Sequence, residues 1–165
     1  MMAGLLAAAH SDVAERLIVV GAPAMGVVPE KQFALKGWRH LPDAGQQRAV
    51  HRYNLGALML WDAAKIDDAT VALHEHNVHR DRLPRRRLAH ADVLAQALPR
   101  IHCPVGAIYG AYDSLYKTYM DALEEQFRAV TPQLLDFVRI ADSGHWVQYE
   151  QPQRFMQALR PWLNS

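Results

Sequence analysis

The sequence has little of several features that would restrict its fold or its surroundings. It holds a single cysteine, Cys103, which cannot form an internal disulfide, so a disulfide-stapled domain is excluded and a cytoplasmic location is expected. The longest apolar run, from Leu17 to Val28, is interrupted by two glycines and a proline. It is also shorter than the ~20 residues that a membrane-spanning helix needs. We therefore expect no membrane partner.

An excess of charge of one sign is also lacking. The chain carries 18 basic and 17 acidic residues, for a formal net charge of +1. Proteins that bind nucleic acid through its phosphates need a surplus of positive charge. We expect no nucleic-acid partner, although five arginines gather between Arg80 and Arg87. The 165 residues are half hydrophobic, which is enough for one buried core and excludes a disordered or fibrous protein.

Three short apolar segments have the pattern of strands in a parallel sheet that is buried on both faces. These segments are Arg16 to Pro23, Pro104 to Gly110 and Leu134 to Ile140. Helical patterns surround them: Met1 to His10, which we expect to be mostly buried, Tyr116 to Ala129, and a final helix that begins at Gln151-Pro152. Strands separated by helices predict right-handed crossovers. The predicted fold class is α/β, with a parallel sheet flanked by helices.

The segment 27–98 differs from the rest of the chain. It is rich in arginine and histidine, has scattered prolines, and contains helical stretches around 44–63 and 66–78. We predict that it is a helical cap inserted between two core segments, 1–26 and 99–165.

Candidate catalytic side chains follow two of the predicted strands. Asp113 ends the loop after the second strand, and His145 lies in the loop after the third. The carboxyl ends of parallel strands meet at one edge of a sheet, so the two side chains should lie within hydrogen-bond reach. This is the order of the acid and the base in a Ser…Asp…His arrangement. The carboxylate would hold the imidazole in the tautomer that a general base needs.

Several local motifs occur together in a characteristic order. They are Leu17 to Gly21 before Ala22-Pro23, the segment Ile101 to Val105 at the start of a strand, G-x-x-D at Gly110 to Asp113, and G-H-W-x-Q-x-E-Q-P at Gly144 to Pro152. With these motifs the whole chain resembles the carboxyl-terminal half of an α/β-hydrolase with its cap. The resemblance implies that Asp113 is the triad acid and His145 the triad base.

Among α/β-hydrolases, the chain looks most like the carbon–carbon bond hydrolases that act on meta-cleavage products of aromatic rings. The string Asn77 to Arg82 and the pair His145-Trp146 carry this likeness. It implies a small-molecule substrate, a dienoate or an ester, that is contacted by Trp146 and by Arg80 or Arg82, with no cofactor. A solvated position for the two arginines is an equal alternative.

The sequence departs from the family in its nucleophile. Met1 to Ala7 resembles the helix that follows the nucleophile elbow, and none of the four serines lies in a G-x-S-x-G elbow. We therefore expect the acid, the base and the cap without the serine, and an inactive chain when it is alone. Two other hypotheses remain open: a non-catalytic interaction module, and a half-enzyme completed by another chain. The strand that begins at Leu17 would then expose an edge, so self-association or a partner chain is expected there.

Asp113, His145 and the histidines near His74 also have simpler, non-catalytic interpretations. Asp113 alone could be a turn residue and His145 alone a residue at the start of a helix, and Asp142 is a weaker candidate for the acid. The histidines between His74 and His79 invite a metal site, but the H-E-x-x-H pattern would need a histidine where Val78 stands. We favour a solvated helix face there and predict no metal site.

Overall fold

The computed structural model describes residues 1–28, 33–81 and 91–163. Its centre is a sheet of three parallel strands in the order β1 (Leu17–Val20), β2 (Val105–Gly110), β3 (Leu134–Ile140). Every residue of β2 is buried, as the middle strand of a sheet covered on both faces requires. The predicted α/β class with three parallel strands is confirmed.

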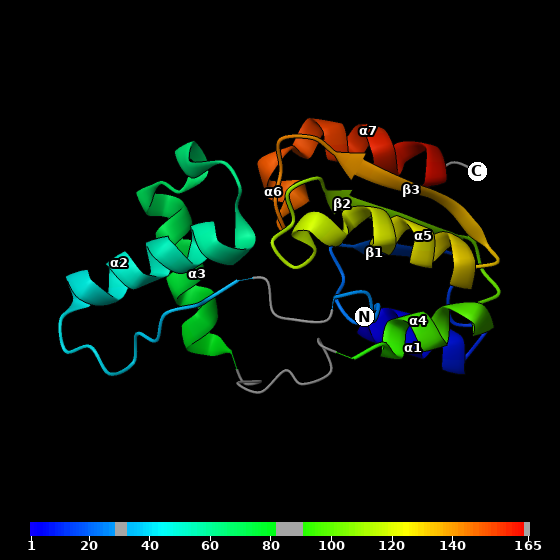
Figure 1. Ribbon diagram of the computed structural model, residues 1–165, viewed down its shortest axis with the longest axis horizontal. Coiled ribbons are helices and arrows are strands. Elements are labelled where there is room, and N and C mark those ends of the chain that lie inside the picture. The colour runs from blue at the N-terminus through cyan, green and yellow to red at the C-terminus, as the bar shows by residue number, and fades with distance from the viewer. Residues whose placement is uncertain (29–32, 82–90, 164–165) are drawn as a thin grey trace.

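Helices cover the two faces of the sheet, as Figure 1 shows. One face carries α1 (Met2–Ala9), α4 (Val93–Ala97) with the short η4 (Leu98–Arg100), and α5 (Met120–Val130), which follows η5 (Lys117–Tyr119). The other face carries α7 (Pro152–Leu163), preceded by α6 (Val147–Glu150). Leu17 and Val19 of β1 pack toward the first layer, and Ile18 packs toward the second. Alternating side chains on a strand explain why this segment is apolar throughout.

Close packing joins the central strand to both layers. On one face, the Tyr109 ring of β2 stacks on Phe137 of β3 with centroids 5.2 Å apart, and Phe127 of α5 packs against both rings. On the other face, a Cβ atom at Gly106 would lie only 2.4 Å from the Trp162 ring. The glycine therefore lets the indole of α7 rest directly on the strand.

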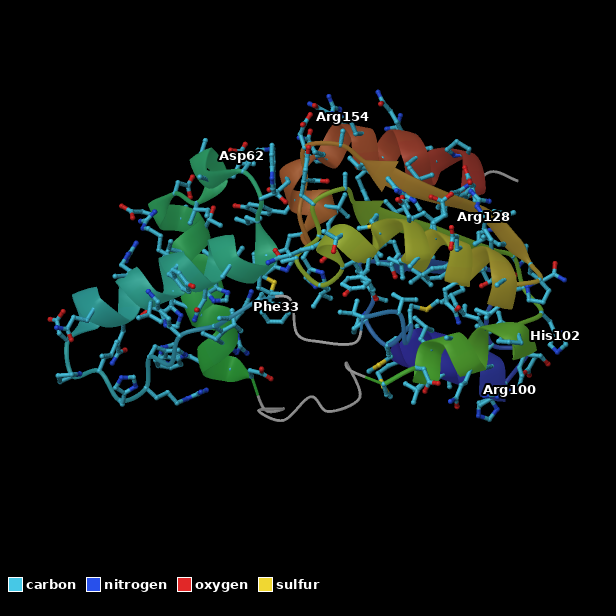
Figure 2. All side chains as sticks on the ribbon, in the orientation of Figure 1. Phe33, Asp62, Arg100, His102, Arg128 and Arg154 are labelled. Atoms are coloured by element: carbon cyan, nitrogen blue, oxygen red, sulfur yellow. The ribbon has the colours of Figure 1, made fainter. Side chains whose placement is uncertain are left out.

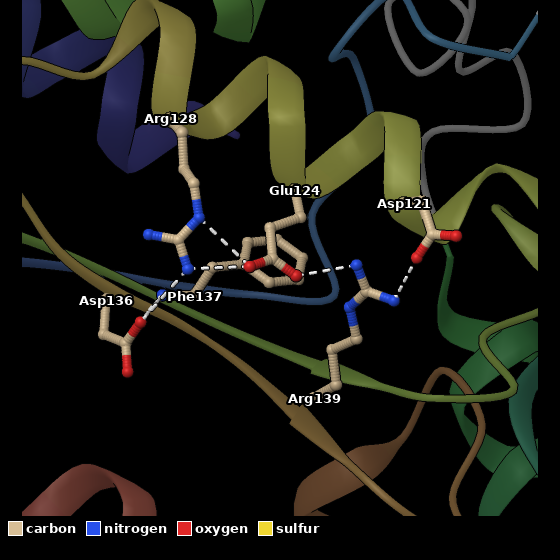
Figure 3. A network of polar contacts seen from close by, with 6 residues as sticks. All are labelled: Asp121, Glu124, Arg128, Asp136, Phe137 and Arg139. Carbon is tan, nitrogen blue, oxygen red and sulfur yellow. Dashed lines mark hydrogen bonds and ion pairs between the residues drawn. The ribbon is translucent and has the colours of Figure 1, made fainter.

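A charged network on the outer surface ties α5 to β3 (Figure 3). Glu124 of α5 accepts hydrogen bonds from Arg128 at 2.7 Å and from Arg139 of β3 at 2.6 Å. Arg139 also pairs with Asp121, and Arg128 lies 3.5 Å from Asp136. The hydrogen bond from Arg128 lowers the pKa of Glu124, and the bond from Arg139 adds to this effect.

The first helix is less buried than expected. Only Gly4 and Ala7 of α1 are buried, because small residues allow the helix to approach Leu94 and Leu17 closely. Met2 and Leu6 remain 65% and 54% exposed. Within the described ranges, β1 pairs with β2 alone. The first strand and the first helix thus present an apolar flank.

A helical lobe stands beside this core, on the left of Figure 1. It consists of α2 (Ala44–Asn54), the π-helical turn η1 (Leu55–Met59), the short η2 (Ala63–Lys65) and α3 (Asp68–Arg80). Aspartates at positions 43, 62 and 67 begin three of these elements, each accepting a hydrogen bond from a backbone N–H of the first turn. Among the helices described, none is both long and apolar enough to cross a membrane.

The last residues of the predicted cap segment, 27–98, pack with the core. Leu94, Ala95 and Leu98 are buried in the same cluster as Leu17 and Phe127, so α4 is part of the core layer. Among the described residues, the helices of the lobe lie between residues 33 and 81. Five residues of α4 are too few for their apolar spacing to show from sequence which body they join.

Candidate active site

Asp113 and His145 meet at the carboxyl-terminal edge of the sheet, as predicted. The Asp113 carboxylate follows β2 and the His145 imidazole follows β3, with Oδ2 of the acid 3.0 Å from Nδ1 of the ring. The Asp113 side chain is fully buried, whereas 21% of the His145 side chain is exposed. A buried acid behind a partly exposed imidazole leaves Nε2 as the nitrogen that can exchange a proton with a reactant.

The turn after β2 fixes the orientation of the acid. The second carboxylate oxygen of Asp113, Oδ1, accepts a hydrogen bond from the Leu115 amide at 2.9 Å. The Asp113 amide donates to the Gly110 carbonyl, and its own carbonyl accepts from the amides of Tyr116 and Lys117. One carboxylate oxygen therefore serves the turn, and the other is directed at His145.

Two glycines make room for the histidine loop. Gly21, at the end of β1, has a positive φ of 52°, and a Cβ atom there would lie 3.1 Å from the His145 carbonyl oxygen and 3.3 Å from Nδ1. A Cβ atom on Gly110, at the end of β2, would collide with the Gly144 carbonyl at 2.1 Å. Both strand ends must lack side chains for the loop to lie across them.

Buried tyrosines hold the segment after β1 against the acid loop. The hydroxyl groups of Tyr109 and Tyr116 both donate to the Ala22 carbonyl, at 2.9 and 2.6 Å. Burial raises the pKa of both phenols, so they keep the protons that they donate. The three loops at this edge of the sheet thus form one connected unit.

Glu150 joins the histidine loop to the lobe. Its side chain is fully buried, and Oε1 accepts hydrogen bonds from the amides of Trp61 and Asp62, each at 2.8 Å. Oε2 accepts from the amide of Gly144, beside the catalytic candidate histidine. The Glu150 carbonyl also accepts from the Lys65 ammonium group. One carboxylate therefore fixes two segments that lie almost 90 residues apart in the chain.

Aromatic side chains reinforce this joint. The Trp146 amide donates to the Met59 carbonyl at 2.9 Å, and its ring packs against the lobe's apolar cluster, where it lies 6.3 Å from the ring of His74. Trp61 of the lobe stacks on Tyr112 of the acid loop with centroids 4.4 Å apart and planes 11° from parallel. Both loops that carry the acid and the base are therefore in contact with the lobe.

Of the two arginines expected near the substrate, the structure describes Arg80. Arg80 lies at the exposed end of α3, with Nη1 3.1 Å from Nε2 of His76. Among the described residues, the structure does not bring Arg80 into contact with the Asp113–His145 pair. Arg82 lies outside the described residues.

The weaker alternatives for acid and nucleophile are engaged elsewhere. Asp142 has a positive φ of 56°, pairs with Arg154 at 3.2 Å, and accepts a hydrogen bond from Gln151 at its carbonyl. Asp142 therefore shapes the loop that carries His145. The buried Ser143 hydroxyl donates to the Ile140 carbonyl at 2.9 Å.

Two further features lie away from this pair. A hollow of about 340 Å³ lies between α4 and α5, lined by residues such as Met25, Asp92 and Gln126, and includes neither the acid nor the histidine. Figure 2 shows Arg100 and His102 at the end of the core that is distant from the lobe. Neither feature supplies a substrate pocket for Asp113 and His145.

No protein-family model and no curated protein sequence matches this chain. Solved structures do match it. A meta-cleavage product hydrolase (CumD) from Pseudomonas fluorescens IP01 is 17% identical, with a TM-score of 0.68 over 99% of this chain and 60% of its own. A serine hydrolase involved in carbazole degradation (CarC) is 20% identical, with a TM-score of 0.65 and coverages of 99% and 60%.

A membrane phospholipase A described as a bacterial virulence factor is similar at 19% identity, with a TM-score of 0.65, over 99% of this chain and 53% of that protein. The expected fold is confirmed: the chain has part of the α/β-hydrolase fold, and meta-cleavage product hydrolases are among its structural neighbours. The chain spans about 60% of the length of the first of these structures.

Proposed function

We propose that this chain supplies the acid and the base of a Ser-His-Asp hydrolase reaction. The 3.0 Å contact between the buried Asp113 carboxylate and His145 Nδ1 carries the proposal. With Nδ1–H donating to Asp113, the opposite nitrogen Nε2 takes the proton of a serine hydroxyl and later returns it to the leaving group. Asp113 stabilises the imidazolium ion that forms between these two steps.

The serine of this reaction comes from residues outside these 165. The sequence has no G-x-S-x-G elbow, and Ser143 uses its hydroxyl within its own loop. The site as a whole thus needs a segment that carries a nucleophile, either on the same polypeptide or on a second chain. A single cysteine supports a cytoplasmic setting.

The substrate is a small molecule held between the core and the lobe, which acts as the cap. Trp146 and a cap arginine, Arg80 or Arg82, are our candidates for contact with it. The structural neighbours include a meta-cleavage product hydrolase and a phospholipase, so a ring-cleavage dienoate and an ester are both retained. The two classes share the general base and differ in the group that leaves.

A non-catalytic interaction module is the second candidate function. Its support is the apolar flank of β1 and α1, where Met2 and Leu6 are exposed and β1 pairs with β2 alone among the described residues. A module of this kind would keep its binding partner when His145 is replaced.

The coding DNA ahead of Met1 gives the first test. The proposal expects an in-frame G-x-S-x-G there or on a separate, co-purifying chain. The resulting complete protein should hydrolyse p-nitrophenyl esters and lose at least about a thousandfold in kcat on His145→Ala. His102→Ala, which changes an exposed histidine far from the lobe, is the matched control. Equal activity of the His145→Ala and His102→Ala variants would contradict the proposal.

The 165-residue chain alone gives the second test. It should hydrolyse p-nitrophenyl acetate no faster than free imidazole at the same concentration, because His145 then has no serine to activate. A faster reaction that Ser114→Ala or Ser143→Ala abolishes would show that the nucleophile is within the chain.

A further inference from the structure

We propose that His51, Glu75 and His79 form a binding site for a divalent transition-metal ion, with zinc as the best-fitting ion. The site lies between α2 and α3 of the lobe and includes neither Asp113 nor His145. The ligand atoms of the three side chains lie within 4.8 Å of one another. The proposal stands independently of the hydrolase function.

The helices bring the three side chains together by simple geometry. Glu75 and His79 are four residues apart on α3, so they share one face of that helix. His51 of α2 faces them, with its ring centroid 6.2 Å from that of His79. Ligand atoms on one zinc ion are roughly 3.3–3.6 Å apart, as metal–ligand distances of about 2.0–2.2 Å require. Glu75 and His79 are not buried, so rotation of these two side chains would bring the ligand atoms to this spacing.

The environment of His51 also favours a bound ion. Its side chain is fully buried, and neither of its ring nitrogens has a hydrogen-bond partner among the described residues. A buried polar group without a partner is costly, and native proteins rarely keep one without a reason. A metal ion on one ring nitrogen supplies a partner that this imidazole lacks.

The donor set selects the ion. Two imidazoles and one carboxylate are a known set of protein ligands in four-coordinate zinc sites whose fourth ligand is water. Calcium and magnesium prefer all-oxygen surroundings, so nitrogen donors disfavour them. The Trp38 ring packs against both His51 and His79, with ring centroids 4.8 and 4.5 Å away, and so lies beside the proposed site. The exposed Arg39, stacked on Trp38, is a like charge near the site and moderates its affinity.

The position of the site indicates what the ion would do. Among the residues that the structure describes, the apolar cluster of the lobe has three buried members, Leu55, Leu60 and Val71. A metal ion shared by α2 and α3 would clamp the two helices together where this small core does not reach. Bound metal stabilises the folded state to which it binds.

The test is a zinc titration of the untagged full chain, since a polyhistidine tag binds the same ions. Isothermal titration calorimetry should show one zinc ion per chain, and calcium at the same concentration should not compete. Glu75→Gln and His79→Gln, both at positions that are not buried, should each weaken binding more than about tenfold, because even the loss of a supporting partner outside the ligand set costs 10–100-fold. His102→Gln is the matched control and should bind zinc as the wild type does.

Cobalt gives a readout that does not depend on stability. Co²⁺ in the site should quench Trp38 fluorescence, and Trp38→Phe should remove that part of the quenching while stoichiometry stays at one. Quenching lost in His79→Gln but retained in His102→Gln would support the site. Zinc binding that is unchanged in both Glu75→Gln and His79→Gln, or absent from the wild type, would overturn it.

Discussion

Replacement of Glu150 by glutamine tests how the lobe is joined to the histidine loop. The two carboxylate oxygens of Glu150 accept three hydrogen bonds from backbone N–H groups, those of Trp61, Asp62 and Gly144. Glutamine keeps the shape but has one oxygen, so its NH₂ group must face at least one of these N–H donors. One orientation loses the bond to Gly144, and the other loses both bonds to the lobe.

The cost follows from these losses. A hydrogen bond to a charged acceptor contributes roughly 1.5–3 kcal/mol, and the bonds that remain become neutral and about half as strong. Glu150→Gln should therefore lower the free energy of unfolding by roughly 3 kcal/mol. This is a large part of the ~5–15 kcal/mol that stabilises a typical domain.

Urea unfolding followed by tryptophan fluorescence measures this change. Glu125→Gln makes the same substitution at an exposed position of α5 and should stay within about 0.5 kcal/mol of the wild type. Hydrogen exchange at the Gly144 and Trp61 amides should become faster in Glu150→Gln alone. Unfolding and exchange that match those of Glu125→Gln would refute the role assigned to this carboxylate.

Three further predictions concern the core. Glu124→Gln should be less stable than the wild type at pH 7 and should lose less stability on acidification. The hydrogen bond from Arg128 lowers the pKa of Glu124, so the stability that this carboxylate contributes above its ordinary pKa of 4.5 is lost as pH falls through the lowered pKa. Urea midpoints from pH 3 to 7 that parallel those of the wild type would contradict this. Gly21→Ala should cost about 1 kcal/mol or more, from the positive φ, and displace the His145 imidazole; an unchanged His145 NMR resonance would argue against the close approach. The isolated chain should self-associate through β1 and α1, and Leu6→Lys should reduce this in analytical ultracentrifugation; a stable wild-type monomer with that flank uncovered would defeat the prediction.

Local patterns were sufficient to predict the sheet and the catalytic candidates. Strands leave short apolar runs that end at glycine or proline, and parallel strands send their following loops to one edge. The meeting of Asp113 and His145 follows from those two rules together with the order of the chain.

Long-range contacts left no comparable trace in the sequence. Glu150 binds backbone N–H groups, which every residue except proline offers, so nothing in the sequence marks its partners. The His51–Glu75–His79 group draws one member from a different helix, and a search for histidines at fixed spacing along α3 alone could not find it. The apolar residues of α1 predict a mostly buried helix, yet the residues that it buries are its smallest ones, Gly4 and Ala7.

The tautomer of the His145 imidazole shows whether Asp113 and His145 act as an acid–base pair. Two-bond ¹H–¹⁵N NMR of the 165-residue chain, above the pH at which imidazoles bind a second proton, distinguishes a proton on Nδ1 from one on Nε2. We expect a proton on Nδ1, donated to Asp113, and an unprotonated Nε2 that is ready to act as a base. Asp113→Asn should remove this preference, and His102, exposed and distant from the lobe, serves as the internal reference. A proton on Nε2 in the wild type, unaffected by Asp113→Asn, would contradict the pairing of acid and base.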